Sequence, residues 1–72
     1  MSPAPRDVAI REETIRLGQL LKLSGLAESG AEARSLVQDG LVQVNGEVET
    51  RRGRQLHRGD LVVVDGERVR VA

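Results

Sequence analysis

The stretch SGAEARSLVQDGLVQVNG, residues 29–46, carries the strongest signals for secondary structure in this 72-residue chain. Ser29 and Glu32 form an S-x-x-E pair, which is typical of a capping box at the start of a helix, and Gly40 can end that helix. After Gly40 the apolar residues alternate, and Asn45-Gly46 favours a tight hairpin turn. The stretch therefore predicts a helix followed directly by a β-hairpin.

A second helical pattern lies upstream, between Thr14 and Gly25, where the residues at helical spacing are Leu17, Leu20, Leu21 and Ser24. Before it, Val8 to Glu13 has the pattern of a short edge strand. Residues 1–7 contain two prolines and small residues, so we expect a flexible N-terminal tail there.

The C-terminal part of the chain has the pattern of strands. Val48 begins the return strand of the first hairpin. Asp65-Gly66 is a second tight turn, between the apolar run at residues 61–64 and a last strand in which Val69 and Val71 alternate with arginines. The order is helix, helix, hairpin, loop, hairpin, and it predicts an α+β fold in which two short antiparallel helices pack on one face of a small, mainly antiparallel twisted sheet. We expect one domain, over residues 8–72.

The composition excludes several classes of protein. There is no cysteine and only one histidine, which rules out a disulfide scaffold or a zinc knuckle. The chain also contains no Phe, Tyr or Trp, so a nucleic acid would be bound through its backbone and shape and not by stacking of bases. With no apolar signal segment and no long apolar run, we expect a cytoplasmic protein that does not bind membranes.

Arginine is concentrated in ETRRGRQLHRG, residues 49–59, although eleven basic and eleven acidic residues cancel over the whole chain. Four arginines fall between positions 51 and 58, and no acid stands among them. Guanidinium groups bind phosphate oxygens in bidentate fashion, so this segment is a candidate for phosphate contacts. The alternative is a solvated loop whose arginines pair with Glu47, Glu49 or Asp60.

The helices supply further candidates. Arg34, Ser29 and the amides at the start of the second helix are suited to binding an anion, and Lys22 and Arg16 on the first helix can border the same groove. Solvation or pairing with a glutamate would explain the same residues without a function.

No catalytic or metal-binding pattern is visible. Glu12 and Glu13 are adjacent on a predicted strand and point to opposite faces, and Asp65 is explained by its turn. His57 has no neighbouring nucleophile, and the glycines form no phosphate-binding motif. We expect no enzyme activity, no cofactor, no metal and no small-molecule substrate.

The spacing of the central residues resembles S-x-x-x-A-R/K-x-L-I/V-x-x-G-x-V-x-V-N-G of the ribosomal-protein-S4-type (αL) RNA-binding domain. The matching residues are Ser29, Ala33, Arg34, Leu36, Val37, Gly40, Val42, Val44, Asn45 and Gly46. Three further stretches, at residues 20–25, 28–33 and 48–51, are similar to the stand-alone, YbcJ-like bacterial members.

This resemblance implies an α+β fold with a groove for structured RNA at the helix pair and the adjoining loop. It carries over Lys22 and Arg34 from the helices and the arginines of the hairpin side. Many members have arginine after the capping serine, where this chain has Gly30, so the resemblance implies one contact fewer between the helix and RNA.

Together these observations predict a non-catalytic, monomeric protein that binds the backbone of structured RNA, ribosomal or tRNA-like. The predicted RNA-binding residues are Arg16, Lys22, Ser29, Arg34, Arg51, Arg52, Arg54 and Arg58. The competing hypothesis is a protein-interaction module that docks on an acidic partner.

Overall fold

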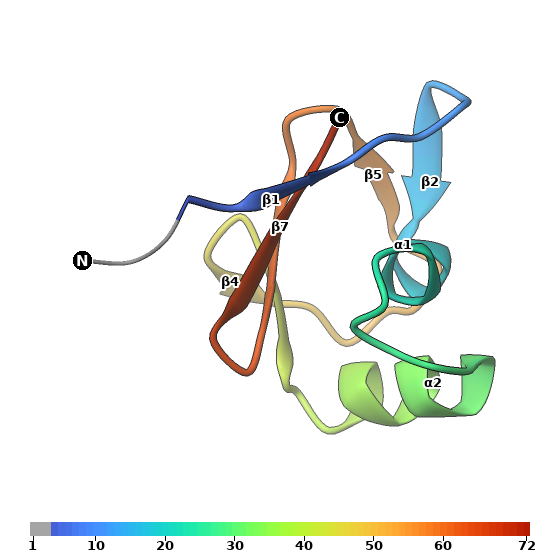
Figure 1. Cartoon of the computed structure of the whole chain (residues 1–72). Helices are drawn as coiled ribbons and strands as arrows, with labels where there is room; N and C mark the ends of the chain where they lie inside the picture. The colour runs from blue at the N-terminus through green and yellow to red at the C-terminus, as the bar shows by residue number, and fades with distance from the viewer. Residues whose placement is uncertain (1–3) are drawn as a thin grey trace.

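The computed structural model describes residues 4–72, and two hairpins supply four adjacent strands of its five-stranded sheet (Figure 1). The elements are β1 Arg6–Val8, β2 Thr14–Arg16, α1 Leu17–Leu23, α2 Gly30–Gln38, β3 Val42–Val44, β4 Glu47–Val48, β5 Gln55–His57, β6 Leu61–Val64 and β7 Glu67–Val71. The α+β class predicted from the sequence is confirmed.

Both predicted hairpin turns are present. Asn45 has φ 52° and Asp65 has φ 49°, and each is followed by a glycine that also has positive φ. Two successive residues in the left-handed backbone conformation match the twist of the flanking strands, which is why Asn-Gly and Asp-Gly are favoured there. The strand order in the sheet is β1-β7-β6-β3-β4, with all pairs antiparallel except β1 with β7.

A second, two-stranded sheet was not predicted. Its strands are β2 and β5, with Ile15 opposite Leu56 (Figure 1). Thr14–Arg16 was expected to be helical and Gln55–His57 to lie in a loop, and both predictions were wrong. Each strand has only three residues, too few for a period, and the two are about forty positions apart in the chain, so the pairing depends on tertiary contacts that local patterns do not contain.

The N-terminal boundary also differs from the prediction. Arg6 and Asp7, assigned to the flexible tail, lie in β1 and pair with Val69 and Arg70 of β7. Of the edge strand predicted from Val8 to Glu13, only Val8 belongs to a strand. The first three residues of the predicted tail lie outside the described part of the chain.

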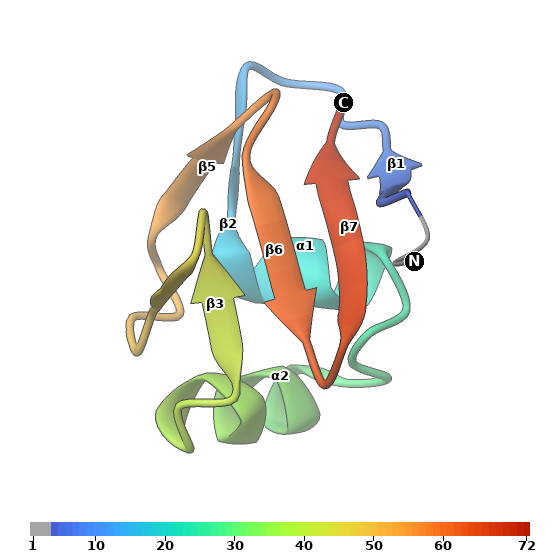
Figure 2. The same cartoon turned by 90° about the vertical axis from the view of Figure 1, so that its left-hand side faces the viewer.

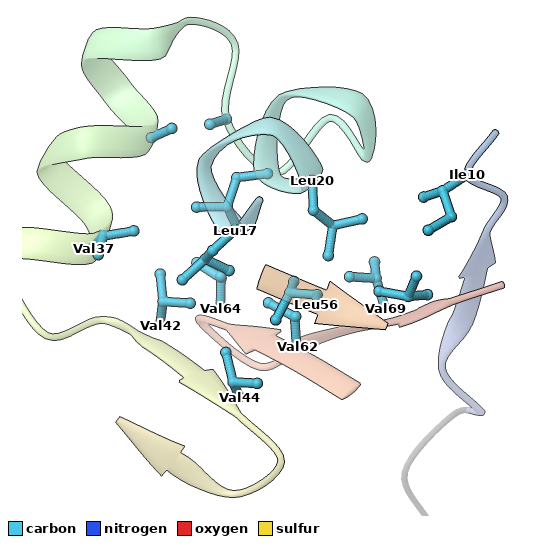
Figure 3. Packing of buried hydrophobic residues seen from close by; sticks show 14 residues of the cluster. Ile10, Leu17, Leu20, Val37, Val42, Val44, Leu56, Val62, Val64 and Val69 are labelled. Carbon is cyan, nitrogen blue, oxygen red and sulfur yellow. The ribbon is translucent and has the colours of Figure 1, made fainter. Parts of the chain in front are cut away.

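The core lies between the helices and one face of the larger sheet, as predicted (Figures 2 and 3). The alternating valines of β3, β6 and β7 point into it, while Leu17 and Leu20 of α1 and Val37 of α2 enter from the other side. Leu56 of β5 is also fully buried, which joins the small sheet to the same core. The helices are adjacent, but their axes cross, since Figure 1 shows α1 nearly end-on and α2 from the side. Within residues 4–72, no helix is long and apolar enough to cross a membrane.

Candidate nucleic-acid interface

Three of the predicted basic residues meet around one surface hollow. Arg16, Lys22 and Arg52 line a hollow of about 280 Å³, and no acidic side chain takes part in its lining. We call it the basic hollow; its other lining residues are Gly18, Gln19, Gly30 and Gly53. The structure therefore brings together cations from the N-cap of α1, from its last turn, and from the segment after β4.

The segment after β4 is held across the start of α1 by backbone hydrogen bonds. The amide of Leu17 donates to the carbonyl of Arg54 (2.9 Å), and the amide of Gly18 donates to the carbonyl of Arg52 (3.0 Å). Arg16 is the N-cap residue, but its side chain makes no capping hydrogen bond, so these carbonyls do the capping. Because the two amides are occupied, an anion in the basic hollow would meet side chains and not these N–H groups.

Gly18 allows this close approach. A Cβ atom at position 18 would lie 2.6 Å from Cγ of Arg52, which is closer than two non-bonded carbon atoms can come. Gly18 is itself buried, although it lies inside a helix, where glycine is unfavourable. Its place in the helix is therefore explained by contact with Arg52.

Two other arginines are engaged by Glu49, which is only 6% exposed. The Glu49 carboxylate accepts hydrogen bonds from Nε and Nη2 of Arg51 (3.2 and 3.3 Å) and from Nη1 of Arg54 (3.1 Å). The amides of Thr50 and Arg51 also donate to it, each at 3.0 Å. The hydrogen bonds from Arg51, with that from Arg54, outweigh the effect of burial and lower the pKa of Glu49 to about 2.

The arginine-rich segment thus divides into two groups. For Arg51 and Arg54 the pairing with Glu49 considered as an alternative is present. The side chain of Arg52 has neither a hydrogen bond nor an ion pair within the described chain; it is exposed and lines the basic hollow. The absence of acids between positions 51 and 58 therefore did not mean that all these arginines were unpaired.

The remaining predicted residues lie elsewhere. Ser29 caps α2 as predicted, accepting from the amide of Glu32 (3.1 Å), but Glu32 reaches back to the amide of Glu28 and not to that of Ser29. Arg34 is exposed on α2, one turn after Gly30, but does not line the basic hollow. Arg58 donates to the carbonyl of Ile10 (3.0 Å), which ties β5 to the segment before β2.

Two lining residues were missed from the sequence. Gln19 lies one turn before Lys22, and its helical spacing from the predicted basic residue could have indicated it. Gly18 interrupts a leucine-rich helix, and an internal glycine of that kind is a sign of close backbone contact.

Asp60, the other acid considered as an arginine partner, instead accepts from the His57 amide and the Asn45 side chain. Burial disfavours the charged form of Asp60, but these bonds outweigh it and lower its pKa.

Comparison with known proteins assigns the fold. The family model of the S4 domain matches residues 8–72, which is nearly the whole chain. The chain belongs to the S4-domain family. It is 42% identical over 59 residues to a Bacillus subtilis protein named "Probable ribosome maturation protein RlbA", a match that covers 82% of this chain and 83% of that protein.

The Escherichia coli relative, named "Putative RNA-binding protein YbcJ", is 42% identical over 57 residues, covering 79% of this chain and 81% of that one. Its solution structure, described as having an αL motif involved in RNA binding, matches with a TM-score of 0.73 and 33% identity, over 100% of this chain and 92% of that one. This S4-domain chain also shares its fold with ribosomal protein S4e of Thermoplasma acidophilum, at a TM-score of 0.64 and 23% identity, over 83% of this chain and 32% of that longer one.

Proposed function

We propose that this S4-domain protein is a non-catalytic binder of structured RNA, and that the basic hollow is the centre of its RNA contact. The observation that carries the proposal is the meeting of Arg16, Lys22 and Arg52 around one hollow without an acid in the lining. Phosphate groups placed there would gain charge-assisted hydrogen bonds from cations that have no other partner in the described chain.

The relatives support RNA as the ligand. The names of two of them refer to ribosome maturation and to RNA binding. We therefore propose ribosomal RNA, or a precursor of it, as the natural target, which would place the protein in the cytoplasm.

The composition indicates how the RNA is recognised. Phosphate contacts orient a protein on RNA without reading the bases, and this chain has no Phe, Tyr or Trp on which a base could stack. We therefore propose that the protein recognises the shape of a folded RNA, such as a helix end or a junction. Arg34, on the same side of α2 as Gly30 by helical spacing, would extend the contact beyond the hollow. Ser29 would act indirectly, by fixing the start of α2.

A binding titration with end-labelled RNA tests this proposal. The wild type is compared with Lys22→Ala/Arg52→Ala and, as a control of equal charge, with Arg68→Ala/Arg70→Ala on β7, outside the basic hollow. We expect the first variant to bind at least about tenfold more weakly and the control to bind nearly as the wild type does. For the wild type, the log–log slope of affinity against salt should lie between about −2 and −3, as three phosphate contacts require.

The same titration separates RNA from an acidic protein partner. Polyglutamate is added as a competitor at a charge concentration equal to that of an unlabelled hairpin RNA. If the hairpin displaces the labelled RNA and polyglutamate does not, the ligand is recognised as RNA. Equal competition, or equal losses in the two double variants, would contradict the proposal and favour a general affinity for acidic molecules.

A further inference from the structure

Glu49 is the one charged residue that is buried in the described chain, residues 4–72. Its side chain is 8% exposed and follows β4 directly, where the chain leaves the sheet. A buried carboxylate is costly to desolvate unless its oxygens are hydrogen-bonded, and here both oxygens are. A charged residue on the surface can serve solubility alone, but a buried, hydrogen-bonded carboxylate must have another role.

The hydrogen bonds of Glu49 define the path of the next five residues. The amides of Thr50 and Arg51 turn towards its Oε2 atom, and the Arg54 side chain returns to its Oε1 atom. The amide of Arg54 also donates to the carbonyl of Arg51 (3.2 Å), which closes a turn around Arg52 and Gly53. Arg52 is therefore at the tip of a turn whose two ends are fastened to the same carboxylate.

The other side of this turn is fastened to α1. The carbonyls of Arg52 and Arg54 accept from the amides of Gly18 and Leu17, so the turn is held by α1 on one side and by Glu49 on the other. Arg51 and Arg54 are used in this attachment, while Arg52 is left to line the basic hollow with Arg16 and Lys22.

We propose that Glu49 is a positioning residue of the RNA-binding site, which holds the turn at residues 50–54 so that Arg52 lines the basic hollow. The inference rests on the proposed function, since it assigns to Glu49 a role in the same site. A fixed arginine loses less conformational freedom on binding than a mobile one, so its contact with phosphate contributes more to affinity.

Positioning by Glu49 and simple electrostatics predict opposite changes in RNA affinity when the Glu49 carboxylate is removed. Removing a carboxylate beside an RNA site raises the local positive charge and should strengthen binding to a polyanion. If Glu49 positions Arg52, its removal should weaken binding instead.

The experiment compares Glu49→Gln with Glu47→Gln in titrations with an end-labelled hairpin RNA at fixed salt. Both variants remove one negative charge from the same part of the chain, but Glu47 is exposed. We expect Glu49→Gln to bind about fivefold more weakly and Glu47→Gln to bind as well as the wild type or slightly better. Far-UV circular dichroism checks that each variant is folded; if Glu49→Gln is not, Glu49→Asp keeps the charge but shortens the reach, and is used in its place.

A double-mutant cycle distinguishes positioning from general destabilisation. If Glu49 acts through Arg52, Arg52→Ala should cost clearly less affinity in the Glu49 variant than in the wild type. Lys22→Ala, which changes a residue on α1, should cost the same in both. Additive effects in the cycle with Arg52, or an affinity of the folded Glu49 variant equal to or above that of the wild type, would overturn the positioning role. Failure of the wild type itself to bind structured RNA would instead overturn the proposed function, and the positioning role with it.

Discussion

Gly18 and Arg52 are in direct contact: the Gly18 amide donates a 3.0 Å hydrogen bond to the Arg52 carbonyl, and a Cβ atom on Gly18 would come within 2.6 Å of the Arg52 Cγ. This contact joins a position inside α1 to the tip of the turn that follows Glu49. It explains how a helix and a loop from distant parts of the sequence form one basic hollow.

Gly18→Ala should therefore weaken RNA binding without removing any charge. The methyl group would displace the stem of Arg52 from the hollow, and we expect an affinity about three- to tenfold lower. Alanine is favoured over glycine in a helix by about 1 kcal/mol, so a weaker helix could not account for the loss. Gly30→Ala is the matched control, because Gly30 also lines the hollow but an added Cβ meets nothing within 4 Å. Equal affinities for the two variants in an RNA titration would show that the contact with Arg52 is irrelevant to binding.

Arg52 and Arg54 should respond differently to truncation. Arg52→Ala should lower RNA affinity about fivefold and make the salt slope shallower by about 1, with little change in stability, because its side chain is exposed and unpaired. Arg54→Ala should instead lower the free energy of unfolding by about 1 kcal/mol, since Arg54 is partly buried against Glu49. Salt-dependent binding titrations and thermal unfolding followed by circular dichroism measure the two effects. The assignment fails if the Arg54 variant loses more salt dependence than the Arg52 variant.

The contrast between these arginines shows where the sequence was informative. The helix at 30–38 and both hairpins were predictable, because a cap, a period and a turn residue are local signals. Strands β2 and β5, the attachment of residues 50–54 to α1 and the choice of Arg52 over Arg51 and Arg54 all depend on contacts between distant residues. The basic residues could be identified as candidates from the sequence, but their pairing with Glu49 could not be assigned there.

Stability should depend on Glu49 in a defined pH range. Because the pKa of Glu49 in the folded protein is lowered from 4.5 to about 2, the charged carboxylate stabilises the folded state. This contribution is fully present above about pH 4.5, and is lost as the pH falls through that value towards 2. At neutral pH, Glu49→Gln should lower the free energy of unfolding by about 1–2 kcal/mol, and near pH 2 the difference from the wild type should nearly vanish.

Thermal unfolding across this pH range measures the difference between the two proteins. Other carboxyl groups titrate in the same range, so the informative quantity is the wild type minus the variant, with Glu47→Gln as a reference for an exposed acid. A difference that stays constant from neutral pH to pH 2 would mean that the Glu49 carboxylate does not supply the stabilisation.

Leu56 should be essential to the fold although its strand has only three residues. Its side chain is fully buried and connects the β2–β5 sheet to the core. Leu56→Ala should cost about 2–5 kcal/mol of unfolding free energy, as expected for a truncated core leucine. Leu23→Ala, at a leucine that is 56% exposed, should cost under about 1 kcal/mol. Chemical denaturation of both variants tests this, and similar midpoints would contradict the place of Leu56 in the core.

Gly30 offers a test in which function is gained. It lines the basic hollow, its φ is not positive, and an added Cβ atom meets nothing within 4 Å, so a side chain can leave the backbone there without a clash at its first atom. Gly30→Arg should raise RNA affinity about three- to tenfold and steepen the salt slope by about 1, because a fourth cation joins the three already there. The added charge near the start of α2 should cost only a few tenths of a kcal/mol in stability, roughly the size of a helix-dipole effect.

Ala31→Arg is the matched control: it adds the same charge one position later on α2, but Ala31 does not line the hollow. If the two variants tighten binding equally in a salt-dependent RNA titration, net charge and not the basic hollow determines affinity. If only Gly30→Arg does, RNA phosphates lie within reach of position 30.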